Sequence, residues 1–200
     1  MKLIKTKEDL NKYIQADLNS LGIKKITFKM KIKGMLSPQI WKYEVILRKL
    51  EYATNNNKGL RRRWLNFRFY KYGIKLGFTI SPNTFGPGLC LCHVGPIIIN
   101  DHCNIGANAR IHVGVNIGNY SRLDKNWVPD NTPTIGNNVY IGPGAKIFGK
   151  IKIGNNVAIG ANAVVTKDVP DDVTVAGVPA KVINDEGSHG LIIYGASEYK

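Results

Sequence analysis

Four histidines could transfer protons near neutral pH, and His93 stands out among them by its place in the sequence. It lies six residues before Ile99, in a position that aliphatic residues occupy further along the chain. A histidine there is either buried and hydrogen-bonded or placed at the surface for a chemical purpose, and the residues alone leave both open. An imidazole has a pKa of about 6.5 in water, which suits a general base for a hydroxyl proton. His112 is expected on an outside corner or between subunits, and His102 and His189 have no supporting context.

A cysteine pair directly before this histidine superficially suggests zinc. Cys90 and Cys92 precede His93, but structural zinc sites need four ligands at recognisable spacings. Only the lone Cys103 follows, so the sequence predicts no metal site. Three cysteines also do not make a disulfide framework.

The segment that must position these residues repeats every six residues from His93 to Pro170. Glycine follows most of the aliphatic residues, and small or β-branched residues come four positions after them. A period of six excludes both an α-helix, at about 3.6, and a plain strand, at about 2. It fits stacked coils of three short strands, with glycine and asparagine at the corners. We therefore predict a parallel β-helix; a β-sandwich accounts poorly for ten in-register positions. The aliphatic positions are Ile99, Ile105, Ile111, Ile117, Ile135, Ile141, Ile147, Ile153, Ile159 and Val165.

The segment from about residue 80 to 183 resembles the hexapeptide acyltransferases, and serine acetyltransferases most of all. The matching motifs are Phe85-Gly86-Pro87-Gly88, His93-Val94-Gly95-Pro96-Ile97-Ile98-Ile99, Ile141-Gly142-Pro143-Gly144-Ala145-Lys146-Ile147 and Ala176-Gly177-Val178-Pro179-Ala180-Lys181. The resemblance covers about half of the chain and implies a mainly β fold, a left-handed parallel β-helix preceded by a small α-helical region. The left hand comes from the resemblance, because the crossover rule for strands favours the right hand.

The resemblance also implies an acetyl-CoA-dependent O-acetyltransferase with His93 as the general base. The acceptor oxygen would attack the thioester directly, with a backbone N–H stabilising the oxyanion and no covalent enzyme intermediate. Asp101 is a candidate for orienting His93. In this superfamily the coenzyme lies between adjacent β-helices, so the implied assembly is a homotrimer. The positions that match coenzyme contacts are Pro143, Gly144, Ala161, Thr166, Lys167 and Lys181.

A loop at residues 122–134 interrupts the repeat and is expected to bring acceptor-binding groups to the site. The candidates there, together with the residue before His93, are Cys92, Arg122, Asp124, Trp127 and Asp130. Serine acetyltransferases carry Asp where this chain has Cys92, and Asp-Arg-His-Pro where it has Asp130-Asn131-Thr132-Pro133. These losses remove charged groups that would hold free serine. We therefore expect a sugar hydroxyl of a surface polysaccharide or its precursor as the acceptor, as in capsular polysaccharide O-acetyltransferases.

Two alternatives stay open beside this function, and a third is disfavoured. Serine O-acetylation uses the same chemistry with another acceptor, and a non-catalytic β-helix would serve as an assembly or binding module. A β-helical carbonic anhydrase is disfavoured because His93, His102 and His112 are not spaced by eighteen residues.

Charge divides the chain sharply. Residues 1–80 hold 19 Lys and Arg against 5 Asp and Glu, a net +14, whereas residues 81–200 hold 9 of each. A basic surface of this kind is either simply solvated or suits an anionic membrane or glycan. Nucleic acid is not expected as a partner, because no recognition motif accompanies the charge. Without a transmembrane run or a signal peptide, we expect a cytoplasmic protein, with the inner face of the membrane as a possible place of contact.

The chain divides into a basic helical region at 1–78, a β-helix at 79–183 and a tail at 184–200 that we expect to be partly disordered. Thr6 with Asp9 resembles a capping box, and Ser37-Pro38 marks a second helix start. The third helix, Leu60 to Leu76, mixes aromatic side chains with Arg and Lys. Its rings are expected to cover the open end of the β-helix, and the alternative is contact with a membrane surface.

Overall fold

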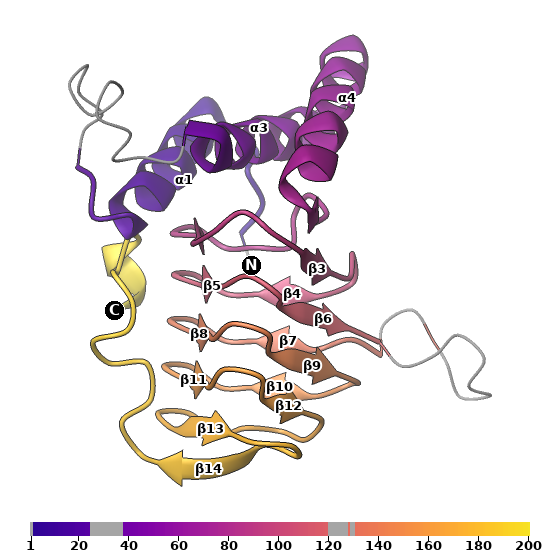
Figure 1. The fold of residues 1–200 in the computed structure, drawn as a ribbon. Helices are drawn as coiled ribbons and strands as arrows, with labels where there is room; N and C mark the ends of the chain where they lie inside the picture. Colours follow the sequence, from indigo (N-terminus) through magenta and orange to yellow (C-terminus); the bar gives the residue numbers. More distant parts are fainter. Residues whose placement is uncertain (1, 25–37, 120–127, 129–130) are drawn as a thin grey trace.

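In the computed structural model, which describes residues 2–24, 38–119, 128 and 131–200, three helices lie across one end of a stack of short strands (Figure 1). The helices are α1 (Lys7–Ser20), α3 (Pro38–Asn55) and α4 (Gly59–Leu76). The strands are β1 (Phe78–Thr79), β2 (Cys90–Leu91), β3 (Ile97–Ile99), β4 (Asn104–Ile105), β5 (Arg110–Ile111), β6 (Asn116–Gly118), β7 (Thr134–Ile135), β8 (Tyr140–Ile141), β9 (Lys146–Phe148), β10 (Lys152–Ile153), β11 (Ala158–Ile159), β12 (Val164–Val165), β13 (Thr174–Ala176) and β14 (Lys181–Asn184).

The strands form the three faces of a prism. One sheet has the order β1-β3-β6-β9-β12, the second β4-β7-β10, and the third β2-β5-β8-β11-β13-β14. Every pair is parallel except β13 with β14, which is antiparallel and closes the far end of the stack. This arrangement is the predicted parallel β-helix, preceded by helices.

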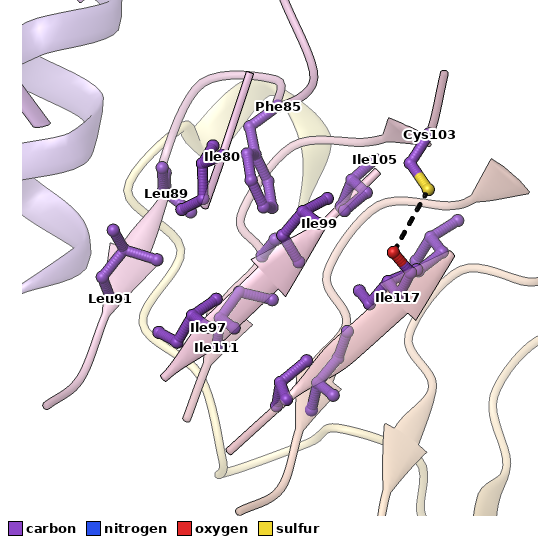
Figure 2. Close-up of a cluster of buried hydrophobic side chains, with 14 of the residues drawn as sticks. Ile80, Phe85, Leu89, Leu91, Ile97, Ile99, Cys103, Ile105, Ile111 and Ile117 are labelled. Carbon is purple, nitrogen blue, oxygen red and sulfur yellow. Dashed lines mark hydrogen bonds between the residues drawn. The ribbon is translucent and has the colours of Figure 1, made fainter. Parts of the chain in front are cut away.

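The repeating aliphatic side chains fill the inside of the prism. All ten predicted positions are at most 3% exposed, and the small residues that follow them, such as Val139 and Ala145, are buried as well. Figure 2 shows Ile97, Ile99, Ile111 and Ile117 stacked between the faces of the first coils. The six-residue period therefore predicted the core residues correctly.

The first coil departs from the predicted phase. Leu91 pairs with Ile111, twenty residues later, whereas Ile99 pairs with Ile117, eighteen residues later. Two additional residues therefore lie between Leu91 and Ile99. The inward position belongs to Leu91, so the expectation that His93 occupies an aliphatic position of the repeat is wrong.

Asparagines stabilise one corner of the prism in the way the sequence predicted. Asn138 has a φ of 58°, and its Nδ2 donates to Asn156 Oδ1 at 2.8 Å on the next coil. The C-terminal tail packs against this ladder, since Asn138 also donates to the carbonyl of Tyr199 at 2.7 Å and Asn108 to that of Ala196 at 3.0 Å. The expectation that the tail is partly disordered is therefore wrong, because these tail residues are hydrogen-bonded to the prism.

Carboxylates of the helices take the place of a missing coil above β2. Glu44 Oε1 accepts the N–H of Leu91 at 3.0 Å, and Asp17 Oδ1 accepts the N–H groups of Gly88 and Leu89, each at 2.9 Å. These backbone donors lie at the edge of a sheet, where unpaired groups would otherwise be buried at a cost. The predicted cap of the open end is thus built from hydrogen bonds as well as apolar cover.

Arg48 completes this cap by donating hydrogen bonds to backbone carbonyls of the first coil. Its guanidinium donates to the carbonyls of Phe85 at 2.9 Å and Gly86 at 2.7 Å, and it pairs with Asp17 at 2.7 Å and Glu51 at 3.0 Å. All three charged side chains are fully buried. Burial raises the pKa of Glu51, and the nearby Arg48 opposes this shift without cancelling it. The desolvation of this carboxyl group therefore outweighs its attraction to Arg48.

α4 covers the prism with only one of its faces. Leu65 and Phe69 are buried, and Phe69 stacks on Tyr43 of α3 with ring centroids 4.6 Å apart. The expectation that the aromatic rings of this helix cover the open end is thus right for Phe69 and wrong for its exposed rings. Among the described residues, no helix has the length and apolar composition needed to cross a bilayer. The exposed apolar side chains of α4 are Leu60, Trp64, Phe67, Tyr70 and Ile74.

Arg48→Met should lower the free energy of unfolding by about 3–5 kcal/mol, because it leaves buried carboxylates without their counter-ion. Urea unfolding followed by circular dichroism measures the loss. Lys49→Met, one residue along the same helix, is the matched control and should change stability by less than about 0.5 kcal/mol. Equal effects of the two substitutions would contradict the proposed role of the cap.

Candidate active site

One edge of the prism, which we call the His93 edge, joins the strands of the β2 sheet to those of the β3 sheet. It consists of the corners at residues 92–96, 112–114, 142–144 and 160–162, and the turn at residues 177–178, which connects β13 to β14, follows at the last coil. Backbone hydrogen bonds link successive corners, from Gly114 N–H to the carbonyl of Pro96 at 2.7 Å and from Gly144 N–H to the carbonyl of Val113 at 2.9 Å. The edge is therefore one continuous, rigid feature along the stack.

His93 lies exposed at the end of this edge nearest the helices. The two additional residues of the first coil place it outside the prism, and Gly95 follows with a φ of 138°. A Cβ at Gly95 would lie 2.4 Å from Cγ2 of Val113, so only glycine fits this close approach between the corners. The imidazole is thus accessible to a ligand that lies along the edge.

His112 and Tyr140 line the same edge beside His93. The ring centroids of His93 and His112 are 5.8 Å apart, and those of His112 and Tyr140 are 5.1 Å apart. Cys92 Sγ lies 3.5 Å from His112 Nε2. The structure therefore brings the predicted base and the predicted acceptor-binding Cys92 together with a second imidazole.

The surroundings of His112 disfavour its charged form. Partial burial lowers its pKa, and Arg110 and His93 lower it further. The contact with Cys90 Sγ, at 3.9 Å, lowers the pKa of the Cys92 thiol, with a smaller contribution from Arg110 and an opposing effect of burial. The imidazole of His112 and the thiol of Cys92 thus both have a lowered pKa, and the Arg110 guanidinium contributes to both shifts.

Asp101 lies at the other end of the segment that contains β3. It is exposed there, with Oδ1 3.9 Å from His102 Nε2. No hydrogen bond or ion pair found for the described residues joins it to His93. An orienting role for Asp101 therefore requires that it come from a neighbouring subunit.

The residues predicted to bind the coenzyme fall into two groups. Pro143, Gly144 and Ala161 lie on the His93 edge, where Asn162 N–H donates to the carbonyl of Pro143 at 2.8 Å. The other three residues line a pocket of about 180 Å³ at the last coil. Four steps of about 4.8 Å separate the first coil from the last, roughly 19 Å along the stack. The residues that share the pocket are Thr166, Lys167 and Lys181.

The predicted acceptor-binding residues of the loop, Arg122, Asp124, Trp127 and Asp130, lie outside the described residues. In the part of the chain that the structure describes, no group of three or more His, Cys, Asp or Glu side chains could hold a metal ion.

Sequence reasoning missed Arg110 and Tyr140, and it placed His112 on an outside corner or between subunits without pairing it with His93. A spacing of eighteen does not align His112 with Cys92, because the first coil is two residues longer. The two aliphatic residues Leu91 and Ile97, six apart and out of phase with Ile99, were the signal that could have shown this.

Comparisons with known proteins agree with the repeat. The family described as "Bacterial transferase hexapeptide (six repeats)" matches residues 132–167, and that described as "Hexapeptide repeat of succinyl-transferase" matches residues 96–128. The serine acetyltransferase of Buchnera aphidicola is 41% identical over 110 residues, which are 54% of this chain and 39% of that protein. The serine acetyltransferase of Staphylococcus epidermidis is 40% identical over 112 residues, 56% of this chain and 51% of that protein. The chain thus spans about two fifths to one half of these relatives.

Solved structures extend the likeness to the helices. A Brucella abortus serine acetyltransferase in complex with coenzyme A superposes with a TM-score of 0.73 at 26% identity, covering 90% of this chain and 70% of that one. A Neisseria gonorrhoeae serine acetyltransferase in complex with serine gives 0.66 at 28% identity, covering 88% and 69%. The fold is a left-handed parallel β-helix with an N-terminal helical region, as predicted.

His112 should titrate below the pKa of about 6.5 of a free imidazole, because its surroundings disfavour the charged form. Replacing either neighbour that lowers it, by Arg110→Gln or His93→Gln, should raise the pKa of His112 toward the free value. NMR titration of the imidazole Cε1–H signals measures the change. A His112 that titrates at or above 6.5 in the unchanged protein would contradict this electrostatic description.

Proposed function

We propose that this hexapeptide-repeat, serine acetyltransferase-like chain is an acetyl-CoA-dependent O-acetyltransferase. The coenzyme supplies an activated acetyl thioester. His93 takes the proton of the acceptor hydroxyl as its oxygen attacks the acetyl carbon, and would return the proton to the sulfur when the carbon–sulfur bond breaks and coenzyme A leaves. His112 lies beside it, and its lowered pKa reduces the positive charge that would oppose this proton uptake.

The observation that carries this proposal is the continuity of the His93 edge. An exposed imidazole lies at one end of the edge, and the backbone corners with Pro143 and Ala161 follow. Lys167 and Lys181 line a pocket at the last coil, which Lys167 enters from the opposite end of β12. An extended pantetheine arm needs backbone partners, and the phosphates at its far end need cations, here Lys167 and Lys181. The proposal thus gives the predicted coenzyme residues one common ligand.

Serine is the acceptor that we propose first, in place of the expected sugar. The most similar proteins reported above are serine acetyltransferases, and one of their structures contains serine. Nothing in these comparisons supports a sugar acceptor or a role in polysaccharide synthesis. Arg110 also supplies a cation at the site, close enough to lower the pKa of both Cys92 and His112, and this cation suits a carboxylate.

A trimer completes the proposed site. A groove between two prisms would enclose the coenzyme on the His93 edge, and Asp101 of a neighbouring subunit could then face His93. Cyclic assembly of this kind uses the same surface on every copy. The roles of His93, Asp101, Cys92 and the loop residues stay predictions, as do the three-part division of the chain and the cytoplasmic location.

His93→Ala should reduce acetyl transfer by about 10²–10⁴-fold, the usual contribution of a positioned general base. Coenzyme A release from acetyl-CoA with L-serine, simple sugars and nucleotide sugars as acceptors measures the rate. His189→Ala, a substitution of an exposed histidine outside the site, is the control and should leave the rate unchanged. Unchanged turnover in His93→Ala would show that His93 is not the general base.

Arg110→Gln should raise the KM for L-serine at least tenfold and leave the KM for acetyl-CoA nearly unchanged, because the guanidinium would pair with the serine carboxylate. Steady-state kinetics with both substrates separates the two effects. Arg110→Lys should recover part of the affinity. Efficient acetylation of a sugar, unaffected by Arg110→Gln, would favour the sugar acceptor over serine.

A further inference from the structure

The outward face of α4 carries exposed apolar side chains from its first turn to its last, with Lys71 among them, and these apolar side chains have no partner among the described residues. Leu60 is 84% exposed, Trp64 56%, Phe67 66% and Ile74 67%. Their spacing of four, three and seven residues places them on one side of the helix, over about 21 Å at 1.5 Å per residue. Isolated exposed apolar residues are ordinary, but a stripe of them on one helix is characteristic of an interaction surface.

This stripe is held rigidly on the molecule. The opposite side of α4 is anchored by Leu65, Phe69 and Leu76, and Gly73 approaches so closely that a Cβ would lie 2.8 Å from the carbonyl oxygen of Phe78. Figure 1 shows α4 projecting beyond the end of the prism. The N-terminal part of α4 thus extends beyond the prism, while its C-terminal end is held at the first coil, where Gly95 N–H donates to the carbonyl of Leu76 at 3.0 Å.

The charge around the stripe has a single sign. α4 contains six cations and no acidic residue. The ion pairs found for the described residues include none of these cations, and Arg68 lies over the Trp64 ring at 4.6 Å. Of the five carboxylates in residues 1–80, only Glu8 is exposed, because the other four are buried. The six cations are Arg61, Arg62, Arg63, Arg68, Lys71 and Lys75.

We propose that the outward face of α4 binds the surface of an anionic phospholipid bilayer. Apolar side chains on one side of a helix enter the boundary between headgroups and acyl chains, and flanking Lys and Arg meet the anionic lipids. A polyanion such as a glycan or nucleic acid has use for the cations but leaves five apolar side chains in water. A second copy of this face would bring twelve like charges together, which opposes self-association.

The test is co-sedimentation of the full chain with vesicles of phosphatidylcholine alone and of phosphatidylcholine mixed with phosphatidylglycerol. The expected result is binding to the mixed vesicles that weakens as the salt concentration rises, with little binding to the neutral ones. Leu60→Gln/Phe67→Gln/Ile74→Gln and Arg61→Gln/Arg63→Gln/Lys71→Gln should each reduce the partition coefficient at least tenfold.

Two matched variants control for composition. Ile183→Gln/Leu191→Gln/Ile193→Gln changes exposed apolar residues elsewhere, and Lys5→Gln/Lys7→Gln/Lys12→Gln removes cations near α1; both should bind within twofold of the unchanged protein. Failure to bind mixed vesicles, or binding that both α4 variants keep, overturns the proposal. Light scattering that shows a larger assembly lost in the apolar α4 variant would assign the face to a second copy instead. Vesicle binding is measured independently of acetyl transfer, so its failure would not contradict the proposed function.

Discussion

The structure depends on how the first coil of the β-helix ends. Each inner coil satisfies its backbone groups from the coils above and below, but the first coil has a neighbour on one side only. Here Asp17, Glu44 and Arg48 supply the missing partners from two helices. Arg48 and Asp17 form an ion pair, and hydrogen bonds to charged groups are stronger than neutral ones, which offsets part of the cost of burying this pair. Burial raises the pKa of Glu44 well above its usual value.

This cap also sets the position of the candidate base. Leu91, whose N–H is held by Glu44, is two residues before His93, and its side chain is fixed inside the prism. The corner that follows carries the imidazole outward at the end of the His93 edge. The helical region and the proposed site are therefore linked directly, because Glu44 of α3 holds the strand that precedes the imidazole.

The sequence predicted what repetition alone determines. Inward aliphatic residues, asparagine corners and the need for a cap follow from six-residue periodicity and from unpaired sheet edges. The shift of the first coil could not be predicted from the regular coils, because an insertion of two residues changes the phase only locally. Glu44, Arg48 and Glu51 follow one another at helical spacing and form a buried polar stripe. They lie beside the apolar residues Tyr43 and Leu47, and the apolar pattern alone does not predict that these polar residues are buried.

For the site, the resemblance identified His93 and the coenzyme positions, which the structure places on one edge and at one terminal pocket. The proximity of His93 to His112 required knowledge of the coil register, and the orienting role of Asp101 depends on a neighbouring subunit.

Hydrogen exchange of individual backbone amides, followed by NMR, tests the central claim about the cap most directly. The amides of Leu89 and Leu91 should exchange as slowly as that of Cys90, which bonds to the next coil. Exchange of Leu89 and Leu91 at the rate of exposed turn residues would contradict it.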